Sequence, residues 1–281
     1  MPPSVQAALL GIVQGLTEFL PVSSSAHLIL ARAFFGYDSD RFGLPFDVAV
    51  HLGTALAVAV YFRREVFQMI QALPRAASWP GQGDQTDASG HGARLIWLLA
   101  VGTVPIAIAG LLFDDLIEQR LRTPAVAATM LAAGAIGFFV VERLGAHARD
   151  DRSLTFLEAF WIGCAQAAAL VPGVSRSGAT ITVALLIGLR RAESARFVFL
   201  LGLPAIVGAA VKELPAFPDA ANGGEMAGLM LVGMASAAVV GYLTMRFFIL
   251  YVGSRSLDVF AWYRLAIAAS VVVWLTLGGA A

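Results

Sequence analysis

Ionisable and polar side chains interrupt an otherwise apolar stretch near the N-terminus. Gln14 and Glu18 are four residues apart, so on a helix they share one face. Pro21 ends that helix, because proline lacks an N–H group and disfavours helical geometry at the residue before it. The serines at 23–25 suit the start of a second helix, since their hydroxyls accept the free N–H groups there. The stretch therefore predicts a helix, a break and a second helix, with a carboxylate, hydroxyls and His27 at the break.

The same pattern returns at a fixed offset of 152 residues. The copies differ where chemistry would differ: the first has Glu18, Ser24 and His27, and the second has Leu170, Arg176 and Ala179 at these places. We interpret the pattern as an internal duplication in which one copy supplies acid/base groups and the other a cation. The identities without a gap are Gly11 with Gly163, Gln14 with Gln166, Ser23 with Ser175, Ser25 with Ser177 and Gly36 with Gly188.

The second break predicts an anion-binding site. A charge deep in a membrane costs about 2.5 to 3.5 kcal/mol, so Glu18 and Arg176 are expected to be paired and functional. A planar guanidinium suits phosphate or carboxylate, and a helix start directs its free N–H groups at an anion. The expected substrate-binding groups around these two residues are Gln14, Ser23, Ser25, Ser175, Ser177, Gly178 and Thr180.

Acid/base groups beside an anion site favour phosphoryl transfer, in which a protein mainly positions groups and neutralises charge. His27 could be a base, an acid or a nucleophile near neutral pH. Glu18 could orient that imidazole or hold a divalent cation on a polyphosphate. Ser24 could be the nucleophile if it is hydrogen-bonded to a base.

Structural interpretations stand beside these. Glu18 and Arg176 could form an ion pair that only ties the two copies together. The serines could be helix caps, and the glutamines could bond only to the backbone at each break. His51, inside a predicted span, is more typical of a packing or hydrogen-bonding residue than of a catalyst, and Asp47 is expected to be a cap or a loop contact.

Composition places the chain in a membrane. It is 58% hydrophobic and 14% charged, whereas a soluble domain has about 25% charged residues. The formal net charge is zero, so nothing indicates a nucleic-acid partner. Cys164 is the only cysteine, which rules out an intramolecular disulfide.

The sequence predicts an all-α polytopic membrane protein with one transmembrane domain, residues 1–281. Repeat one covers 1–142 and repeat two 155–281; each has a re-entrant hairpin, with its break near the middle, and three spans. Because each repeat crosses the membrane three times, an odd number, the second repeat begins on the opposite face. The repeats are therefore expected to be inverted, as in many transporters. The hairpins are predicted at 1–36 and 156–189, the spans at 45–62, 95–113, 125–141, 197–211, 227–249 and 259–279, and polar loops at 63–93, 114–122 and 142–152, with 80–93 mobile.

Basic residues orient this topology. Eleven basic residues that we assign to loops fall on one face of the predicted membrane domain, among them Arg63, Arg149 and Arg190. Five fall on the other face, including Arg122 and Lys212. The richer side is expected to be cytoplasmic. The N-terminus and the first break would then open to the outside.

At the two breaks the sequence resembles the undecaprenyl pyrophosphate phosphatase family, the bacitracin-resistance membrane phosphatases. That family carries [E/Q]xxxE followed by PVSSxxH, present here from Gln14 to His27, and PGxSRSGAT, present from Pro172 to Thr180. The segment FDVAVHLGTALAV at 46–58 is also similar to it. Order and spacing are kept from about residue 5 to the C-terminus.

The resemblance implies an enzyme that removes the terminal phosphate of undecaprenyl pyrophosphate and so recycles the lipid carrier of cell-wall synthesis. It implies a bacterial inner-membrane protein whose site faces the periplasm, with Mg²⁺ or Ca²⁺ as cofactor and Glu18 as its ligand. Catalytic roles carry over to Glu18, His27 and Arg176, with Ser24 and Ser175 in close support. Gln14 stands where the family often has a glutamate, and it cannot offer a negative charge to a cation.

Two questions and two rival functions stay open from the sequence. Either His27 or Ser24 attacks phosphorus, and the oligomeric state is not fixed, a homodimer included. One rival is an inverted-repeat transporter or lipid-phosphate flippase, in which Glu18 and Arg176 would form a substrate or proton site. The other is a structural membrane scaffold, in which neither residue would matter for activity.

Overall fold

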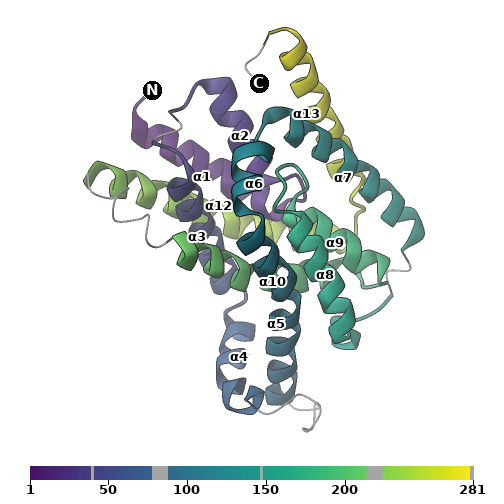
Figure 1. Ribbon diagram of the computed structural model, residues 1–281. Helices are drawn as coiled ribbons and strands as arrows, with labels where there is room; N and C mark the ends of the chain where they lie inside the picture. Colours follow the sequence, from purple (N-terminus) through teal and green to yellow (C-terminus); the bar gives the residue numbers. More distant parts are fainter. Residues whose placement is uncertain (39–40, 78–87, 146–147, 214–223, 279–281) are drawn as a thin grey trace.

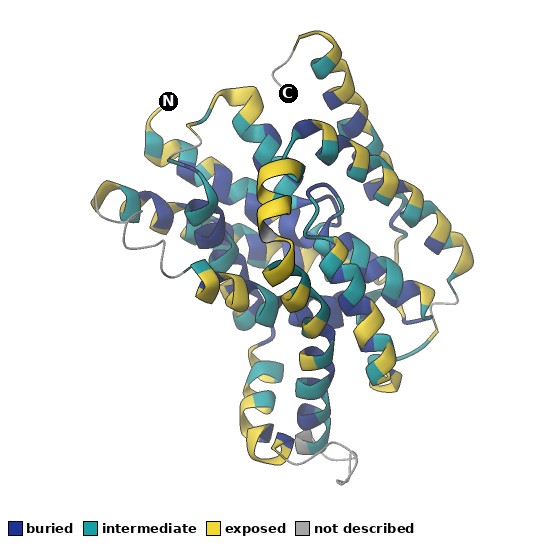
Figure 2. Cartoon of the chain, viewed as in Figure 1, coloured by how far each residue is buried: buried dark blue, intermediate teal, exposed yellow. Residues whose placement is uncertain are grey.

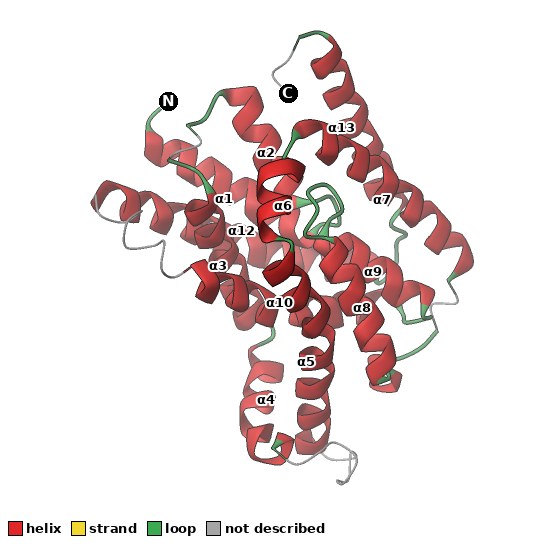
Figure 3. Ribbon diagram, viewed as in Figure 1, coloured by secondary structure: helices red, strands yellow, loops and turns green. Residues whose placement is uncertain are grey.

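The computed structural model describes residues 1–38, 41–77, 88–145, 148–213 and 224–278. These form helices joined by short loops (Figure 3). One isolated bridge in this described part joins Arg149 and Leu189. In chain order the main helices are α1 (Pro3–Phe19), α2 (Ser24–Phe35), α3 (Leu44–Tyr61), α4 (Arg63–Ala76), α5 (Ala88–Leu112), α7 (Pro124–Leu144), α8 (Phe156–Ala168), α9 (Arg176–Leu186), α10 (Arg191–Glu213), α12 (Gly224–Val252) and α13 (Asp258–Thr276).

Six helices in the described residues are long and apolar enough to cross a membrane, which confirms the predicted polytopic all-α class. They lie where the sequence predicts its six spans: Leu44–Tyr61, Gly90–Leu112, Pro124–Leu144, Arg191–Glu213, Gly224–Val252 and Asp258–Thr276. Buried residues concentrate where these helices meet, while large apolar side chains remain exposed on their outer sides (Figure 2). That distribution suits lipid surroundings.

Both predicted helix breaks are present. Leu20, before Pro21, has an extended backbone (φ −70°, ψ 139°), and it ends α1. α2 then begins after Ser23, whose hydroxyl accepts from the N–H of Ala26. In the second copy α9 begins after Ser175, whose hydroxyl accepts from the N–H of Gly178.

The two capping serines share an uncommon backbone conformation. Ser23 has φ 75° and Ser175 φ 73°, and they are the only non-glycine residues of the described chain with positive φ. Such conformations cost about 1 to 3 kcal/mol and persist where the surroundings enforce them. Equal strain at equivalent positions agrees with the proposed duplication, whereas the inversion of the repeats stays a prediction.

Each short first helix of a repeat packs on a long helix of the other half. α1 packs against α12, and α8 against α5 (Figure 1). Both contacts need a glycine, because a Cβ added to Gly11 would collide with the carbonyl oxygen of Gly233, and one added to Gly163 with that of Gly102. These exchanged contacts bring the two breaks together at the centre.

The prediction of a polar loop at 63–93 is wrong where the structure describes it. Residues 63–76 form α4, and α5 begins at Ala88; residues 78–87 lie outside the described residues. The reason is an apolar stripe at helical spacing, Val66, Met69 and Ala72, which packs on the core and on α5 despite the charges between. α4 and the first turns of α5 form the pair that projects from the body in Figure 1.

The segment at 114–122 also differs from a simple turn. It contains a short helical turn, α6 (Asp114–Leu116), and then a π-helix at Ile117–Leu121. π-helical turns are rare and occur often at functional sites. This one ends at Arg122, which faces the central cavity.

Candidate active site

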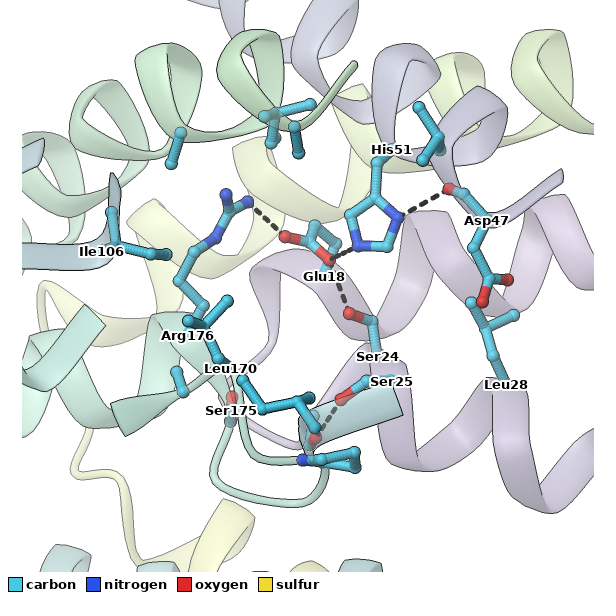
Figure 4. Close-up of a pocket in the computed structure, with 18 of the residues that line it drawn as sticks. Glu18, Ser24, Ser25, Leu28, Asp47, His51, Ile106, Leu170, Ser175 and Arg176 are labelled. Carbon is cyan, nitrogen blue, oxygen red and sulfur yellow. Dashed lines mark hydrogen bonds and ion pairs between the residues drawn. The ribbon is translucent and has the colours of Figure 1, made fainter. Parts of the chain in front are cut away.

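Glu18 lies at the centre of a cavity of about 250 Å³ between the two breaks (Figure 4). Its side chain is 3% exposed. One carboxylate oxygen, Oε1, accepts from the guanidinium of Arg176. The other, Oε2, accepts from Ser24 Oγ at 2.5 Å and from Gln14 Nε2 at 2.8 Å. The predicted meeting of the two breaks is therefore present, with three hydrogen-bond donors around one carboxylate.

Arg176 reaches Glu18 from the first turn of α9. Its Nη1 also donates to the carbonyl of Gly202 on α10 at 3.2 Å, so the guanidinium is held from two sides. Gly202 leaves space for it, because a Cβ there would lie 3.2 Å from the guanidinium carbon. About a fifth of the Arg176 side chain remains exposed, which leaves it accessible to an anion in the cavity.

Direct bonds lock the two breaks together. The N–H of Gly173 donates to Ser23 Oγ at 3.2 Å, and Ser177 Oγ donates to the carbonyl of Leu20 at the same distance. Each copy thus satisfies a polar group of the other. The relative position of Ser24 and Arg176 depends on these crossed bonds.

Arg264 is a residue that the sequence reading missed. It is fully buried on α13, and its guanidinium donates to carbonyls of both breaks: Pro21 in the first, and Gly173 and Val174 in the second. It also donates to Met130 and Leu131 of α7. A single arginine inside an apolar span was the available signal, and its role here is to fix the loops rather than to face the cavity.

His27, the predicted catalytic imidazole, does not line this cavity. Its Nδ1 donates to the carbonyl of Ser23 at 2.7 Å, and its Nε2 lies 2.9 Å from the hydroxyl of Tyr263, on which the ring stacks. His27 therefore supports the first break from behind. Its catalytic role stays a prediction.

His51 and Asp47, which we expected to be a packing residue and a cap, both line the cavity. His51 Nε2 lies 3.5 Å from Glu18 Oε2, and its Nδ1 donates to the carbonyl of Asp47 at 2.7 Å (Figure 4). The carboxylate of Asp47 accepts from Arg32 and from Arg122. The signal for both residues was their i,i+4 spacing on one face of α3.

The remaining predicted residues divide into two groups. Ser23, Ser25 and Ser175 line the cavity together with Ser24. Behind its wall, Gln14 bonds to Glu18, Ser177 to Leu20, Gly178 to Ser175, and Thr180 Oγ1 donates to the carbonyl of Arg176 at 2.6 Å. The second group positions the first and does not face the cavity.

Gln166, the counterpart of Gln14, lines the cavity with its amide unused. The residue is fully buried, and neither Nε2 nor Oε1 has a hydrogen-bond partner among the described residues. Leaving such a group unpaired costs about 1 to 3 kcal/mol. An amide kept in this state on a cavity wall fits a ligand that supplies the missing bonds.

Comparisons with known proteins agree with this site. The family described as "Bacitracin resistance protein BacA" matches residues 7–270. A protein of Rubrobacter xylanophilus called undecaprenyl-diphosphatase is 50% identical over 273 residues, 97% of this chain and 98% of its own. One of the same name from Trichlorobacter lovleyi is 43% identical, over 98% of both chains. "Undecaprenyl-diphosphatase 2" of Stutzerimonas stutzeri is also 43% identical, over 96% of this chain and 97% of its own.

Proposed function

This chain belongs to the bacitracin resistance protein BacA family, and we propose that it hydrolyses undecaprenyl diphosphate to undecaprenyl monophosphate and inorganic phosphate. The observation that carries the proposal is the cavity in which Ser24, Glu18 and Arg176 meet from two separate helix starts. A membrane-embedded cavity with a guanidinium, hydroxyls and a carboxylate suits a phosphorylated lipid.

The terminal phosphoryl group binds between the two breaks. Arg176 offers its guanidinium, whose geometry matches phosphate oxygens. The first turns of α2 and α9 direct backbone N–H groups and the positive ends of their dipoles toward the same space. Substrate oxygens would compete with Glu18 for Arg176. Binding would therefore weaken the bond from Arg176 to Glu18 Oε1 and leave the carboxylate free to accept a proton.

Ser24 is the nucleophile in this proposal. Its hydroxyl already donates to Glu18 at 2.5 Å, a charge-assisted bond that favours loss of the proton to the carboxylate. A bond forms between Ser24 Oγ and the terminal phosphorus, and the bond from that phosphorus to the bridging oxygen breaks. Undecaprenyl monophosphate leaves with that oxygen, and water then releases phosphate from the serine.

His51 completes the proton path. Because its Nδ1–H donates to the carbonyl of Asp47, Nε2 is the ring nitrogen that faces Glu18. It can take the proton that Glu18 receives from Ser24. In the second step, water attacks the phosphorus of the phosphoserine, and the proton of that water leaves with the phosphate. The imidazole can return its proton through the Glu18 carboxylate to Ser24 Oγ.

Mg²⁺ or Ca²⁺ with Glu18 as ligand stays a prediction. No group of three or more acidic, histidine or cysteine side chains in the described residues could hold a metal ion. The two acidic residues of the cavity, Glu18 and Asp47, each already accept from arginines. The steps above therefore use only the chain's own groups, and a cation would take most of its ligands from the diphosphate, as Mg²⁺ commonly does.

We place the protein in the inner membrane of a bacterium, with the cavity open toward the periplasm. The cavity lies near the N-terminal half of α3 and beside Arg122, at the side with fewer basic residues. A homodimer stays a prediction.

Phosphate release by the full chain in detergent micelles tests the function. We expect release from undecaprenyl diphosphate, and about 1,000-fold slower release with Ser24→Ala. A transporter or flippase needs two compartments and would release no phosphate in micelles. A structural scaffold would also release no phosphate. If the wild-type protein releases none, the proposed function is rejected.

A further inference from the structure

Arg122 stands where two cavities meet. The second cavity, of about 340 Å³, lies between α3, α5, the π-helix and α10, and shares with the first a wall that includes Val48, Ile106 and Ala205. Arg122 is the one basic residue that lines both among the described part of the chain. The first cavity contains the reacting groups, and the second is lined mostly by apolar side chains.

The charges around Arg122 are unequal. Its Nη2 lies 2.6 Å from Asp47 Oδ2, and the same carboxylate also accepts from Arg32. Two guanidinium groups thus share one carboxylate, which leaves one positive charge in excess within this cluster, whereas Glu18 and Arg176 balance each other. Glu118, Lys212 and Glu213 also line the second cavity. Arg32 lines neither cavity, but 27% of the Arg122 side chain is exposed and faces both. The excess charge is therefore available to a ligand at Arg122.

The second cavity has room for an apolar chain. Gly110 on α5 and Gly208 on α10 line it, and a Cβ added to either would meet no atom within 4 Å. Open space at both glycines leaves a path between these helices. A hydrocarbon chain in this path would begin beside Arg122.

We propose that Arg122 binds the lipid-linked phosphoryl group of the substrate. The inference rests on the proposed function, because it uses the order of groups in a lipid diphosphate: terminal phosphoryl, second phosphoryl, hydrocarbon chain. With the terminal group at Ser24 and Arg176 and the chain along Gly110 and Gly208, the second phosphoryl group lies at the junction.

This position gives Arg122 a role in both binding and reaction. When the bond to the terminal phosphorus breaks, the bridging oxygen stays with the lipid and its phosphate gains negative charge. A guanidinium at this phosphate stabilises the charge as it develops. The same contact holds the product, so the lipid monophosphate is itself expected to be a ligand of Arg122.

The experiment compares three variants of the full chain in detergent micelles: Arg122→Gln, Arg122→Lys and, as matched control, Arg120→Gln. Arg120 lies in the π-helix that ends just before Arg122, but it is exposed and lines neither cavity. Phosphate release from undecaprenyl diphosphate gives kcat and KM. Inhibition by undecaprenyl monophosphate and its direct binding measure the product contact.

For Arg122→Gln we expect kcat/KM to fall about 10- to 100-fold, as for loss of a hydrogen bond to a charged group. Affinity for the monophosphate should fall by a similar factor, Arg122→Lys should recover part of both, and Arg120→Gln should match wild type. If Arg122→Gln binds undecaprenyl monophosphate as tightly as wild type does, the inference is overturned. This holds whether the variant keeps its activity or loses it through instability. If wild-type protein releases no phosphate, the proposed function fails, and monophosphate binding still decides the role of Arg122.

Discussion

Glu18 and Arg176 are 158 residues apart in the chain, and their side chains form an ion pair in the central cavity. Each comes from a different copy of the duplicated segment. The pair brings the acid/base group of one copy to the cation of the other. Neither copy has both groups at this place, so the site exists only when the two halves pack together.

Breaking this pair is expected to abolish activity. Arg176→Gln leaves the buried carboxylate of Glu18 without its charged partner, which costs about 3 to 5 kcal/mol of stability. Glu18→Gln costs less, because Arg176 is partly exposed and keeps its bond to Gly202. Phosphate release should fall at least about 100-fold in both. The double variant Glu18→Gln/Arg176→Gln separates the two effects: its thermal midpoint should recover while its activity does not. Activity close to wild type in the double variant would favour a purely structural pair.

Ser24→Ala is expected to lower kcat about 1,000-fold, because it removes the proposed nucleophile and leaves the rest of the cavity in place. Mass spectrometry of the wild-type protein after brief exposure to substrate should find phosphate on Ser24. Ser270→Ala, on the exposed side of α13, is the control. Phosphate found on His27 instead would show that the imidazole attacks and that the cavity rearranges around it.

Gln166→Leu is expected to lower activity while keeping or raising stability. The substitution removes two buried polar atoms without partners, so the thermal midpoint should stay level or rise. Phosphate release should fall about 10-fold, because the amide no longer bonds to substrate or water. Gln14→Leu provides the contrast, since Gln14 donates to Glu18 and its loss should lower both quantities. Full activity in Gln166→Leu would show that the amide is idle.

Asp151, in the loop between α7 and α8, is expected to make stability depend on pH. Burial, a hydrogen bond with Asp150 and the nearby Glu193 raise the pKa of Asp151 from 3.8 to about 6. The folded state thus favours the protonated acid, and the stability that it contributes is present below about pH 4 and lost as pH rises through 6. Asp151→Asn should remove this loss and be more stable than wild type above pH 6. Thermal midpoints from pH 5 to 8 measure it, and equal pH profiles for both proteins would contradict it.

The sequence alone determined the local events of this fold. Pro21 ends α1, the hydroxyls of Ser23 and Ser175 cap the next helices, and Gln14 reaches Glu18 one turn away. These depend on atoms within a few residues of one another, so spacing and residue type are enough to predict them. The pairing of Glu18 with Arg176 was also predictable, because a buried charge needs an opposite one.

Only the tertiary structure decided which faces of the helices meet at the cavity. His27 lies in the first turn of α2, yet contact with Tyr263 of α13 turns it away, and His51 of α3 stands beside Glu18 instead. Arg264 joins both breaks, across 90 residues for the second and 243 for the first. The direction of a side chain on a helix is set by packing against distant segments, and this information is not in local spacing.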